Sequence, residues 1–555
     1  MKLFKSAFCL SLIVIVGLQS ASKAQTIDDY DLGGASKPKP QRSFSKEDKY
    51  KRVHQFSLRF ILRGKLDKTE KFLTKFVERF PKDAESLYML GILQGQRGNV
   101  DLAEEFMQRA IDSGLPDDRL VAGPREMMKP LAETALMKQL KEKYSGSALV
   151  HGPLVGNVTD TSASFWVRTA IECDLEVVVS AADEELHSKN VRSKSADDFT
   201  AVISIDGLKP DTEYAYSIIQ NGQGVDVRNN TNQKFRTFPE SGTPSKFSIA
   251  FGGGAGYVPE NERMWDTIES FDPSAILLLG DNVYIDDPES VAMQQYTYQR
   301  RQSRPEWRKL TARSPVFTIW DDHDFSTDDS WGGADIEIPF WKKDWVFPIF
   351  RQNWANPGYG GGDEQPGCWY SFQIGDVDFI MLDCRYYRTN PKVEDGKSML
   401  GPVQKAWLKQ QLLEAKGTFK VLCSSVPWDF RTKGGSLDTW NGYRAEHEEI
   451  LGFLDQHKIE GVVLMSADRH RSDCWKLARP DGYDLYEFNS SRLTNQHVHA
   501  TMEKKGALFS YNEPQSFGLV TFDTTLDDPT VGYEVVNING EKPHSITVKR
   551  SELKR

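Results

Sequence analysis

The chain has 555 residues, and because single domains cluster at about 100–200 residues we expect three folded units rather than one core. At 39% hydrophobic and 27% charged residues, with 13 Trp and 30 Phe, its composition excludes a largely disordered protein. The formal net charge of −10 argues against a nucleic-acid partner, because nucleic-acid binding draws on clustered Lys and Arg.

The stretch 1–24 has the layout of a cleavable secretory signal. Lys2 and Lys5 precede a short apolar run, and small residues lead to Ala24, after which we expect cleavage. That run is shorter than a membrane span, and no later segment offers about 20 uninterrupted apolar residues. We therefore expect no transmembrane segment and a mature protein in the periplasm or outside the cell. The polar residues 25–45 predict a linker.

Residues 46–145 are patterned as a helical region with an internal repeat. The segment RGKLD at 63–67 returns as RGNVD at 97–101, an offset of 34 residues that resembles tetratricopeptide helix pairs. Two copies are fewer than a free-standing array usually needs, so we expect the region to dock on the rest of the protein. It serves either as a surface that binds a protein partner or positions the substrate, or as a helical spacer, and the sequence leaves these roles open.

Residues 148–240 carry short alternating runs separated by turns, which predicts a small β-sandwich. The stretch from Leu208 to Tyr216 resembles the corner of fibronectin type III modules, where a tyrosine is tied back to the backbone. Because this segment has no cluster of metal ligands or nucleophiles, we expect a structural domain. The five cysteines after residue 24 form neither a disulfide framework nor a zinc ribbon, and we expect them in the core.

Residues 245–550 alternate helical segments with short apolar runs, which predicts a layered α/β domain. We expect buried strands at six of these runs, at residues 247–251, 275–279, 316–320, 379–382, 421–424 and 461–465. Each candidate site residue comes directly after one of them. Ligands of open α/β sheets bind at this carboxyl edge of the strands.

Two of these strands end in groups that suit hard metal ions. Asp281 lies at a glycine turn, where a carboxylate can bridge two cations, and Tyr284 is close enough in sequence to reach one of them. The run 321–324, with Asp328 after it, places carboxylates that repel one another unless a cation neutralises them. Within it, Asp322 would bind a metal and His323 would donate a proton to a leaving oxygen.

A third strand is followed by Asp468, Arg469 and His470. Alternate side chains of an extended segment point to the same face, so Asp468 and His470 could act as ligands together. Arg469 and Arg471 would either neutralise a bound phosphate or pair with Asp473, and the sequence does not decide between these roles.

The order of these motifs resembles the calcineurin-like metallophosphoesterases and, more closely, the PhoD-like alkaline phosphatase and phosphodiesterase family. The resemblance spans roughly residues 148–535 and continues through LDCRYYR at 382–388, SSVPW at 424–428 and EFNSS at 487–491. It implies a multidomain protein. An α/β metallophosphoesterase domain of layered β-sheets flanked by helices would follow a fibronectin-like β-sandwich and a short helical repeat region.

The resemblance also implies a centre with two or more metal ions, calcium and a ferric ion. Asp281 would bridge the ions, and Tyr284 and His470 would bind the ferric-type ion. Asp468 would bind the calcium-type ion, completed by Asp322 or Asp328. Arg469 would contact the phosphate ester substrate.

One position departs from the family pattern. Where the family has a cysteine in a segment like FGSC, this chain reads Phe251-Gly252-Gly253-Gly254. A thiolate ligand is absent at Gly254, so calcium is the firmer expectation, and iron(III) or another transition metal the weaker one. The glycine amides could approach a phosphate instead, as in anion-binding loops.

The leading hypothesis is an exported metal-dependent phosphoesterase that hydrolyses phosphomonoesters or phosphodiesters by attack of metal-activated water. A degenerate catalytic domain that acts as a binding protein is the alternative that the missing cysteine favours. A phosphodiesterase directed at phospholipids is another. The sequence leaves the physiological substrate, the metals and the oligomeric state open.

Overall fold

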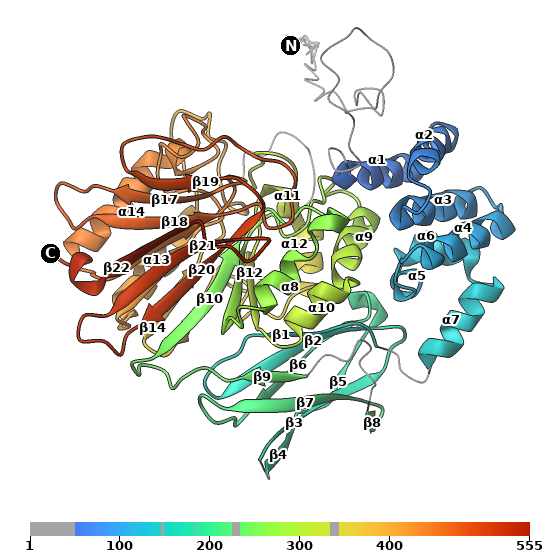
Figure 1. Cartoon of the computed structure of the whole chain (residues 1–555), viewed down its shortest axis with the longest axis horizontal. Helices are drawn as coiled ribbons and strands as arrows, with labels where there is room; N and C mark the ends of the chain where they lie inside the picture. Colours follow the sequence, from blue (N-terminus) through green and yellow to red (C-terminus); the bar gives the residue numbers. More distant parts are fainter. Residues whose placement is uncertain (1–49, 146–148, 183, 225–232, 333–342) are drawn as a thin grey trace, which may run out of the picture. The chain divides into compact units, whose positions relative to one another are not determined.

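A computed structural model describes residues 50–145, 149–182, 184–224, 233–332 and 343–555 (Figure 1). The predicted signal at 1–24 and linker at 25–45 lie outside the described residues. Within the described ranges, no helix has both the length and the apolar character that crossing a membrane requires.

The N-terminal part is helical, as predicted. Its elements are α1 (Tyr50–Leu62), α2 (Leu66–Arg79), α3 (Ala84–Gln96), α4 (Val100–Asp112), α5 (Asp118–Ala122), α6 (Arg125–Met128) and α7 (Ala135–Ser145). The repeated RG segments are the turns of two helix pairs, α1–α2 and α3–α4. Gly64 (φ 69°) and Gly98 (φ 81°) adopt the left-handed conformation that these turns need. The helix pairs thus repeat with the predicted period, while their tetratricopeptide class stays a prediction.

Two large sheets form the framework of the α/β part (Figure 1). The order in the nine-stranded sheet is β22 (His544–Lys549), β21 (Thr530–Asn537), β20 (Ser516–Asp523), β10 (Lys246–Gly252), β11 (Ala275–Leu279), β12 (Val316–Ile319), β1 (Leu149–Gly156), β2 (Ser162–Thr169) and β6 (Thr200–Asp206). The order in the seven-stranded sheet is β13 (Tyr370–Ile374), β14 (Val377–Met381), β15 (Phe419–Cys423), β16 (Val462–Ser466), β18 (Leu485–Ser490), β17 (Ser472–Leu477) and β19 (Ala507–Tyr511).

The six runs expected to be strands are β10, β11, β12, β14, β15 and β16, so this prediction is confirmed to within about two residues. Within each sheet the consecutive members of this set run parallel. Aromatic rings join the two sheets, with Phe317 stacked on Phe372 at a centroid distance of 3.9 Å and Phe247 at 6.5 Å from Phe379. Helices α8 (Met264–Glu269), α9 (Val291–Gln302), α10 (Pro305–Thr311), α11 (Asp322–Phe325), α12 (Lys343–Gln352), α13 (Gly401–Glu414) and α14 (Arg444–Gln456) complete this part.

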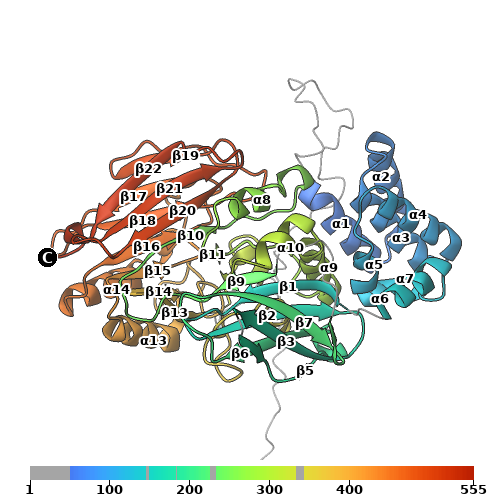
Figure 2. The same ribbon diagram turned by 60° about the horizontal axis from the view of Figure 1, so that its bottom comes forward.

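The region predicted to be a β-sandwich is an antiparallel β domain, and it shares one of its sheets with the α/β part. Its strands β1, β2 and β6 extend the nine-stranded sheet, because β1 pairs with β12 in parallel at Gly156 and Val316. A second sheet holds β3 (Asp174–Ala181), β4 (Glu184–His187), β5 (Val191–Arg192), β7 (Glu213–Gln220), β8 (Gln223–Gly224) and β9 (Lys234–Arg236). Figure 2 shows β3 and β7 beside β2 and β6.

The tyrosine expected to be tied back to the backbone in this domain is Tyr214. Its hydroxyl accepts a hydrogen bond from the Lys209 amide at 2.9 Å. The fibronectin type III class itself stays a prediction. The five cysteines after residue 24 are buried and unpaired, as expected.

The helical region docks on the catalytic part through buried charges, which confirms the expected docking. Arg119 of α5 is fully buried, and its Nη2 lies 3.4 Å from Oε2 of Glu85 in α3. Tyr296 of α9 donates to the same oxygen at 2.8 Å. Burial alone would raise the pKa of Glu85, but the cations Arg119 and Arg300 outweigh it and lower that pKa below its ordinary value.

Replacing Arg119 with alanine should therefore destabilise the protein strongly, because it leaves Glu85 buried without its nearest cation. We expect the free energy of unfolding to fall by about 3–5 kcal/mol in chemical denaturation. Arg109→Ala is the matched control, since Arg109 pairs with Glu105 on the exposed face of α4 at 3.7 Å and should contribute less than about 0.5 kcal/mol. Equal effects of the two substitutions would contradict this account of the docking.

Candidate metal centre

The three motifs lie where three strands end. Asp281 follows β11, Asp322 begins α11 directly after β12, and Asp468 follows β16. Asp281 (φ 52°) and Asp468 (φ 66°) adopt the left-handed conformation, which costs a non-glycine residue energy and is concentrated at functional sites. A Cβ at Gly280 would lie 2.5 Å from that of Asp321, so only glycine lets the first two motif turns approach this closely.

Ligand atoms converge in two groups that share one carboxylate. Asp281, Asp322 and His323 offer ligand atoms that all lie within 4.8 Å of one another, and so do Asp322, Asp328 and Asp329. The structure thus brings together four of the predicted site residues from two strand ends. In the part of the chain that the structure describes, neither of these groups includes Asp468 or His470.

Tyr284 and His470 lie beside the first group and are linked to it by Asn495. The Tyr284 hydroxyl donates to Oδ2 of Asp281 at 2.8 Å, and the Asn495 amide donates to that hydroxyl at 2.6 Å. The same amide nitrogen lies 3.4 Å from Nδ1 of His470. A single side chain therefore orients both predicted ligands. Sequence reasoning missed Asn495, because it belongs to a loop far from the three motifs.

The four titratable residues 321–324 have different tasks. Asp324 is structural, because its carboxylate accepts from the backbone amides of Asp321 and Val283, both at 3.0 Å, and so joins the first two motif turns. Asp322 accepts from the amides of His323 at 3.0 Å and Asp329 at 2.7 Å. These bonds fix the Asp322 carboxylate at the point shared by the two groups.

His323 is held between carboxylates. Its Nδ1 contacts Oδ1 of Asp286, and its Nε2 lies 3.7 Å from Oδ1 of Asp328. Burial disfavours the charged imidazole, but the carboxylates of Asp286, Asp322 and Asp281 outweigh it and raise the pKa of His323 well above its ordinary value. The surrounding carboxylates therefore favour the protonated form of this imidazole. Asp286, five residues after Asp281, is a partner that the motif itself did not reveal.

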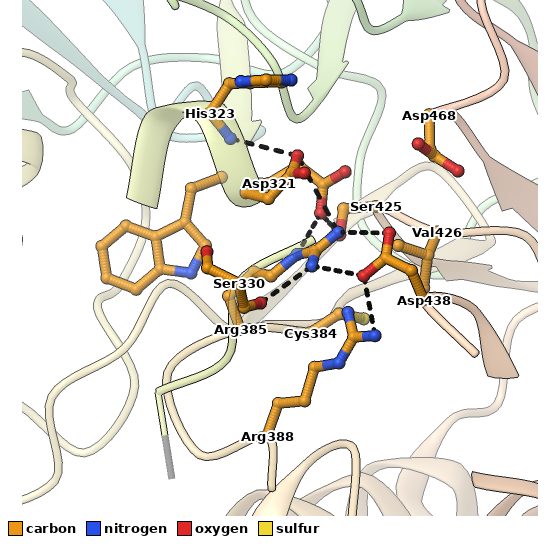
Figure 3. A network of polar contacts seen from close by, with 12 residues as sticks. Asp321, His323, Ser330, Cys384, Arg385, Arg388, Ser425, Val426, Asp438 and Asp468 are labelled. Carbon is orange, nitrogen blue, oxygen red and sulfur yellow. Dashed lines mark hydrogen bonds and ion pairs between the residues drawn. The ribbon is translucent and has the colours of Figure 1, made fainter. Parts of the chain in front are cut away.

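A network of buried arginines and carboxylates lies beside the centre (Figure 3). Arg385 is fully buried; its Nε donates to Asp321 at 2.6 Å and its Nη1 to Asp438 at 2.8 Å. Arg388 reaches the same Asp438 oxygen at 2.8 Å. Burial raises the pKa of Asp321 to about 7 despite the neighbouring guanidinium. Arg385 lies four residues after the end of β14, within the segment LDCRYYR at 382–388 that carries part of the family resemblance, but no role in the site was predicted for it from the sequence.

Lys433 is a second cation that the sequence did not single out. Its Nζ lies 2.9 Å from Asp438, 3.2 Å from Asp468 and 3.4 Å from Asp329. These carboxylates outweigh the effect of burial and raise the pKa of Lys433 well above its ordinary value. An ammonium group thus occupies the side of the centre where Asp468 lies.

The structure gives one of the two arginines near Asp468 the partner that the sequence offered to either. Arg471 pairs with Asp473, with Nε 2.8 Å from Oδ2, and is structural. Arg469 does not share that partner; its Nη1 lies 3.8 Å from Asp468. The Arg469 Nε has no hydrogen-bond partner among the described residues, so this guanidinium retains donors for an anion.

The suggestion that the glycine loop binds phosphate is wrong. The amide of Gly253 donates to Ser490 O at 3.2 Å, that of Gly254 to Gly280 O at 3.3 Å, and that of Ala255 to Asp281 O at 2.8 Å. Since each amide already has a backbone acceptor, none is available for an anion. The loop instead holds the Asp281 turn in place.

The residues present fit a hard cation. Oδ1 of Asp281 is buried and has no hydrogen-bond partner among the described residues, and burial raises the pKa of this carboxyl well above its ordinary value. Carboxylate oxygens with one phenol and few nitrogens are the donor set that calcium and similar ions prefer. A cation at Asp281 would satisfy the orphaned oxygen and offset the cost of burying the charge.

Layered sheets with acidic and imidazole groups at their strand ends define the metallophosphoesterase fold. The model of the PhoD-like phosphatase family matches residues 249–525, and the chain belongs to this family. Residues 146–239 match a family described as a domain of unknown function, DUF7800. The antiparallel β domain therefore has a match of its own, separate from the catalytic part.

Two curated relatives share part of the chain. Alkaline phosphatase D of Bacillus subtilis (strain 168) is 22% identical over 315 residues, which cover 49% of this chain and 53% of the relative. Purple acid phosphatase 23 of Arabidopsis thaliana is 25% identical over 274 residues, or 45% and 53% of the two chains. The chain thus matches about half the length of each of these relatives.

Two solved structures share the fold. The structure of PhoD superposes with a TM-score of 0.60 and 16% identity, covering 71% of this chain and 88% of that one. The purple acid phosphatase PPD1 from yellow lupin (Lupinus luteus) seeds gives 0.56 and 12%, covering 72% and 75%. The α1–α7 region, residues 50–145, precedes both family matches.

Replacing Asp281 with asparagine tests the centre without reference to catalysis. Because the substitution removes a buried charge but keeps an acceptor for Tyr284, we expect the metal-free protein to gain about 1–3 kcal/mol of stability. A cation that binds the folded wild type should raise its melting temperature, and the variant should lose this shift. Scanning calorimetry with and without calcium measures both effects.

Asp395→Asn, on an exposed loop, is the matched control and should leave both quantities unchanged. If calcium raised the melting temperature of the Asp281 variant as much as that of the wild type, the cation would bind elsewhere.

Proposed function

We propose that this protein is an exported metal-dependent phosphoesterase that hydrolyses phosphomonoesters, phosphodiesters or both. The observation that carries the proposal is the convergence of Asp281, Asp322 and His323 from two strand ends, with a buried carboxylate oxygen left unsatisfied. Membership in the PhoD-like phosphatase family supports the same activity. Export rests on the signal layout of residues 1–24.

The ligands proposed for two or more ions are Asp281, Tyr284, Asp322, Asp328, Asp468 and His470. Bound cations would supply an activated water and neutralise negative charge that develops on phosphorus oxygens. The oxygen donors favour calcium for at least one ion. Iron(III) or another transition metal would have to bind without the thiolate that Gly254 lacks.

The chain's own groups complete the reaction. His323, protonated and oriented by Asp286, would donate its proton to the leaving oxygen. Arg469, whose Nε has no hydrogen-bond partner among the described residues, would bind the phosphate. Lys433 could supply a second positive charge on the same side, because its ammonium group already lies among carboxylates of the centre.

Two other functions were considered for this chain. A degenerate domain that only binds is favoured by glycine at position 254, but the remaining predicted ligands are all present and several converge. No contact of the described residues favours a phospholipid over another phosphate ester. A protein partner for residues 46–145 stays a proposal, and the acidic net charge still argues against nucleic acid.

Metal analysis combined with hydrolysis of chromogenic substrates tests the enzyme proposal. We expect purified protein to contain metal and to hydrolyse a nitrophenyl phosphomonoester or phosphodiester, to lose activity with chelator, and to regain it with added divalent ions. Asp281→Asn should abolish turnover, because the cation would lose its bridging ligand. Protein that binds no metal and hydrolyses neither ester under any added ion would instead support the binding-protein hypothesis.

A further inference from the structure

Three histidine rings lie together beside the position where the family cysteine is missing. The ring centroid of His470 lies 4.9 Å from that of His497 and 5.6 Å from that of His499, and the last two are 4.8 Å apart. His470 is buried, whereas His497 is exposed and His499 half-buried. His470 comes from the third motif, and the other two come from the loop after β18.

The cluster lies against Gly254. A Cβ built on Gly254 would lie 3.3 Å from Nδ1 of His470, so a side chain at this position would point at the same imidazole. The loop with the other two histidines is anchored there, because the Asn495 amide donates to Gly254 O at 3.1 Å. Asn495 Oδ1 in turn accepts from the His497 amide at 3.1 Å, and Asn512 donates to His499 O at 2.9 Å.

The spacing of the rings is that of ligands around one ion. Zinc–imidazole bonds of about 2.0–2.1 Å in tetrahedral geometry place ring centroids roughly 5 Å apart, close to the three separations found here. The ring nitrogens do not converge as tightly as the ligand atoms around Asp322. Binding of one ion by all three rings would require the exposed ring of His497 to turn toward His470.

We propose that His470, His497 and His499 form an imidazole site for a transition-metal dication such as zinc or cobalt, in place of a site that would use a thiolate at position 254. Tyr284 and Asn495 border this site. Three neutral nitrogens select a borderline metal over calcium, which prefers oxygen. The proposal deepens the proposed function, because His470 belongs to both ligand sets.

Metal binding itself tests this site. Cobalt is titrated into metal-free wild type and into the double variant His497→Ala/His499→Ala, and its visible absorption and bound stoichiometry are measured. We expect the double variant to bind one cobalt fewer per chain, or to bind it at least about 100-fold more weakly. Calcium binding should not change. Circular dichroism checks that the variant is folded.

His457→Ala is the matched control, since His457 is exposed just after α14 and its ring contacts Phe453 instead of the cluster. Wild-type cobalt affinity and stoichiometry in the double variant would overturn the proposal. Because hydrolysis is not measured, this result is separate from failure of the enzyme proposal.

An independent set of contacts joins helix α1 to the loop that follows Asp281. Gln55 donates to the backbone carbonyl of Tyr284 and, at 3.3 Å, to Oδ2 of Asp286. Arg59 donates to Asp286 O at 2.6 Å and pairs with Asp287 at 2.8 Å. The carboxylate that orients His323 is thus itself held by a helix outside the region that the family model matches.

We infer that Gln55 and Arg59 are positioning residues for the loop 281–287, which gives the helical region a task distinct from a spacer, a partner surface or a surface that contacts substrate. Removing Arg59 frees Asp286 and Asp287 from one of their anchors. On the proposed function, this lowers kcat through His323 and leaves KM nearly unchanged, because neither residue would touch substrate.

Arg59→Ala should lower kcat about tenfold and speed hydrogen exchange of the amides in 281–287. Arg59→Lys should restore the kcat and the slow exchange in part. Arg63→Ala should change neither quantity, because Arg63 is exposed in the turn that follows α1. Unchanged exchange in Arg59→Ala would overturn the positioning role even if the protein hydrolysed no ester.

Discussion

The cost of burying carboxylates at the ends of parallel strands is the constraint on which the rest of this structure depends. Asp281, Asp321, Asp322 and Asp324 are all buried within a few residues of two strand ends. Low dielectric surroundings disfavour their charged forms, and their mutual repulsion adds to that cost. Each of these carboxylates has a hydrogen-bond donor or a cationic side chain beside it, or is a proposed ligand of a metal ion, and these partners offset the cost of burial.

The protein supplies only part of that compensation. Arg385 neutralises Asp321 and Asp438, and backbone amides satisfy Asp322 and Asp324. Asp281 and Asp321 each keep one oxygen without a hydrogen-bond partner among the described residues. Asp321 pairs with the Arg385 guanidinium, whereas no lysine or arginine of the described residues pairs with Asp281, so an external cation is expected at Asp281.

The surrounding domains add to the same centre. The antiparallel β domain shares the nine-stranded sheet, because its strand β1 pairs with β12, the strand that leads into Asp322. The helical region reaches the loop after Asp281 through α1 and is anchored by the buried Arg119. The helical region, for which the sequence left a spacer, a partner surface or a substrate-positioning surface open, therefore contacts the loop after Asp281 directly.

By itself, the sequence determined the strands and the residues at their ends, because hydrophobic runs and glycine turns are local signals. Asp281, Asp322, Asp328 and His323 were found this way, and so was the repeat of helix pairs. Tertiary structure alone decided which distant groups meet them. Arg385, Lys433, Asn495 and the histidines at 497 and 499 lie on other strands and loops, and no spacing in the chain relates them to the motifs. Sequence likewise could not tell that the glycine amides are used by the backbone, or that Arg471 rather than Arg469 pairs with Asp473. Both outcomes depend on how close separate segments come once the sheets are packed.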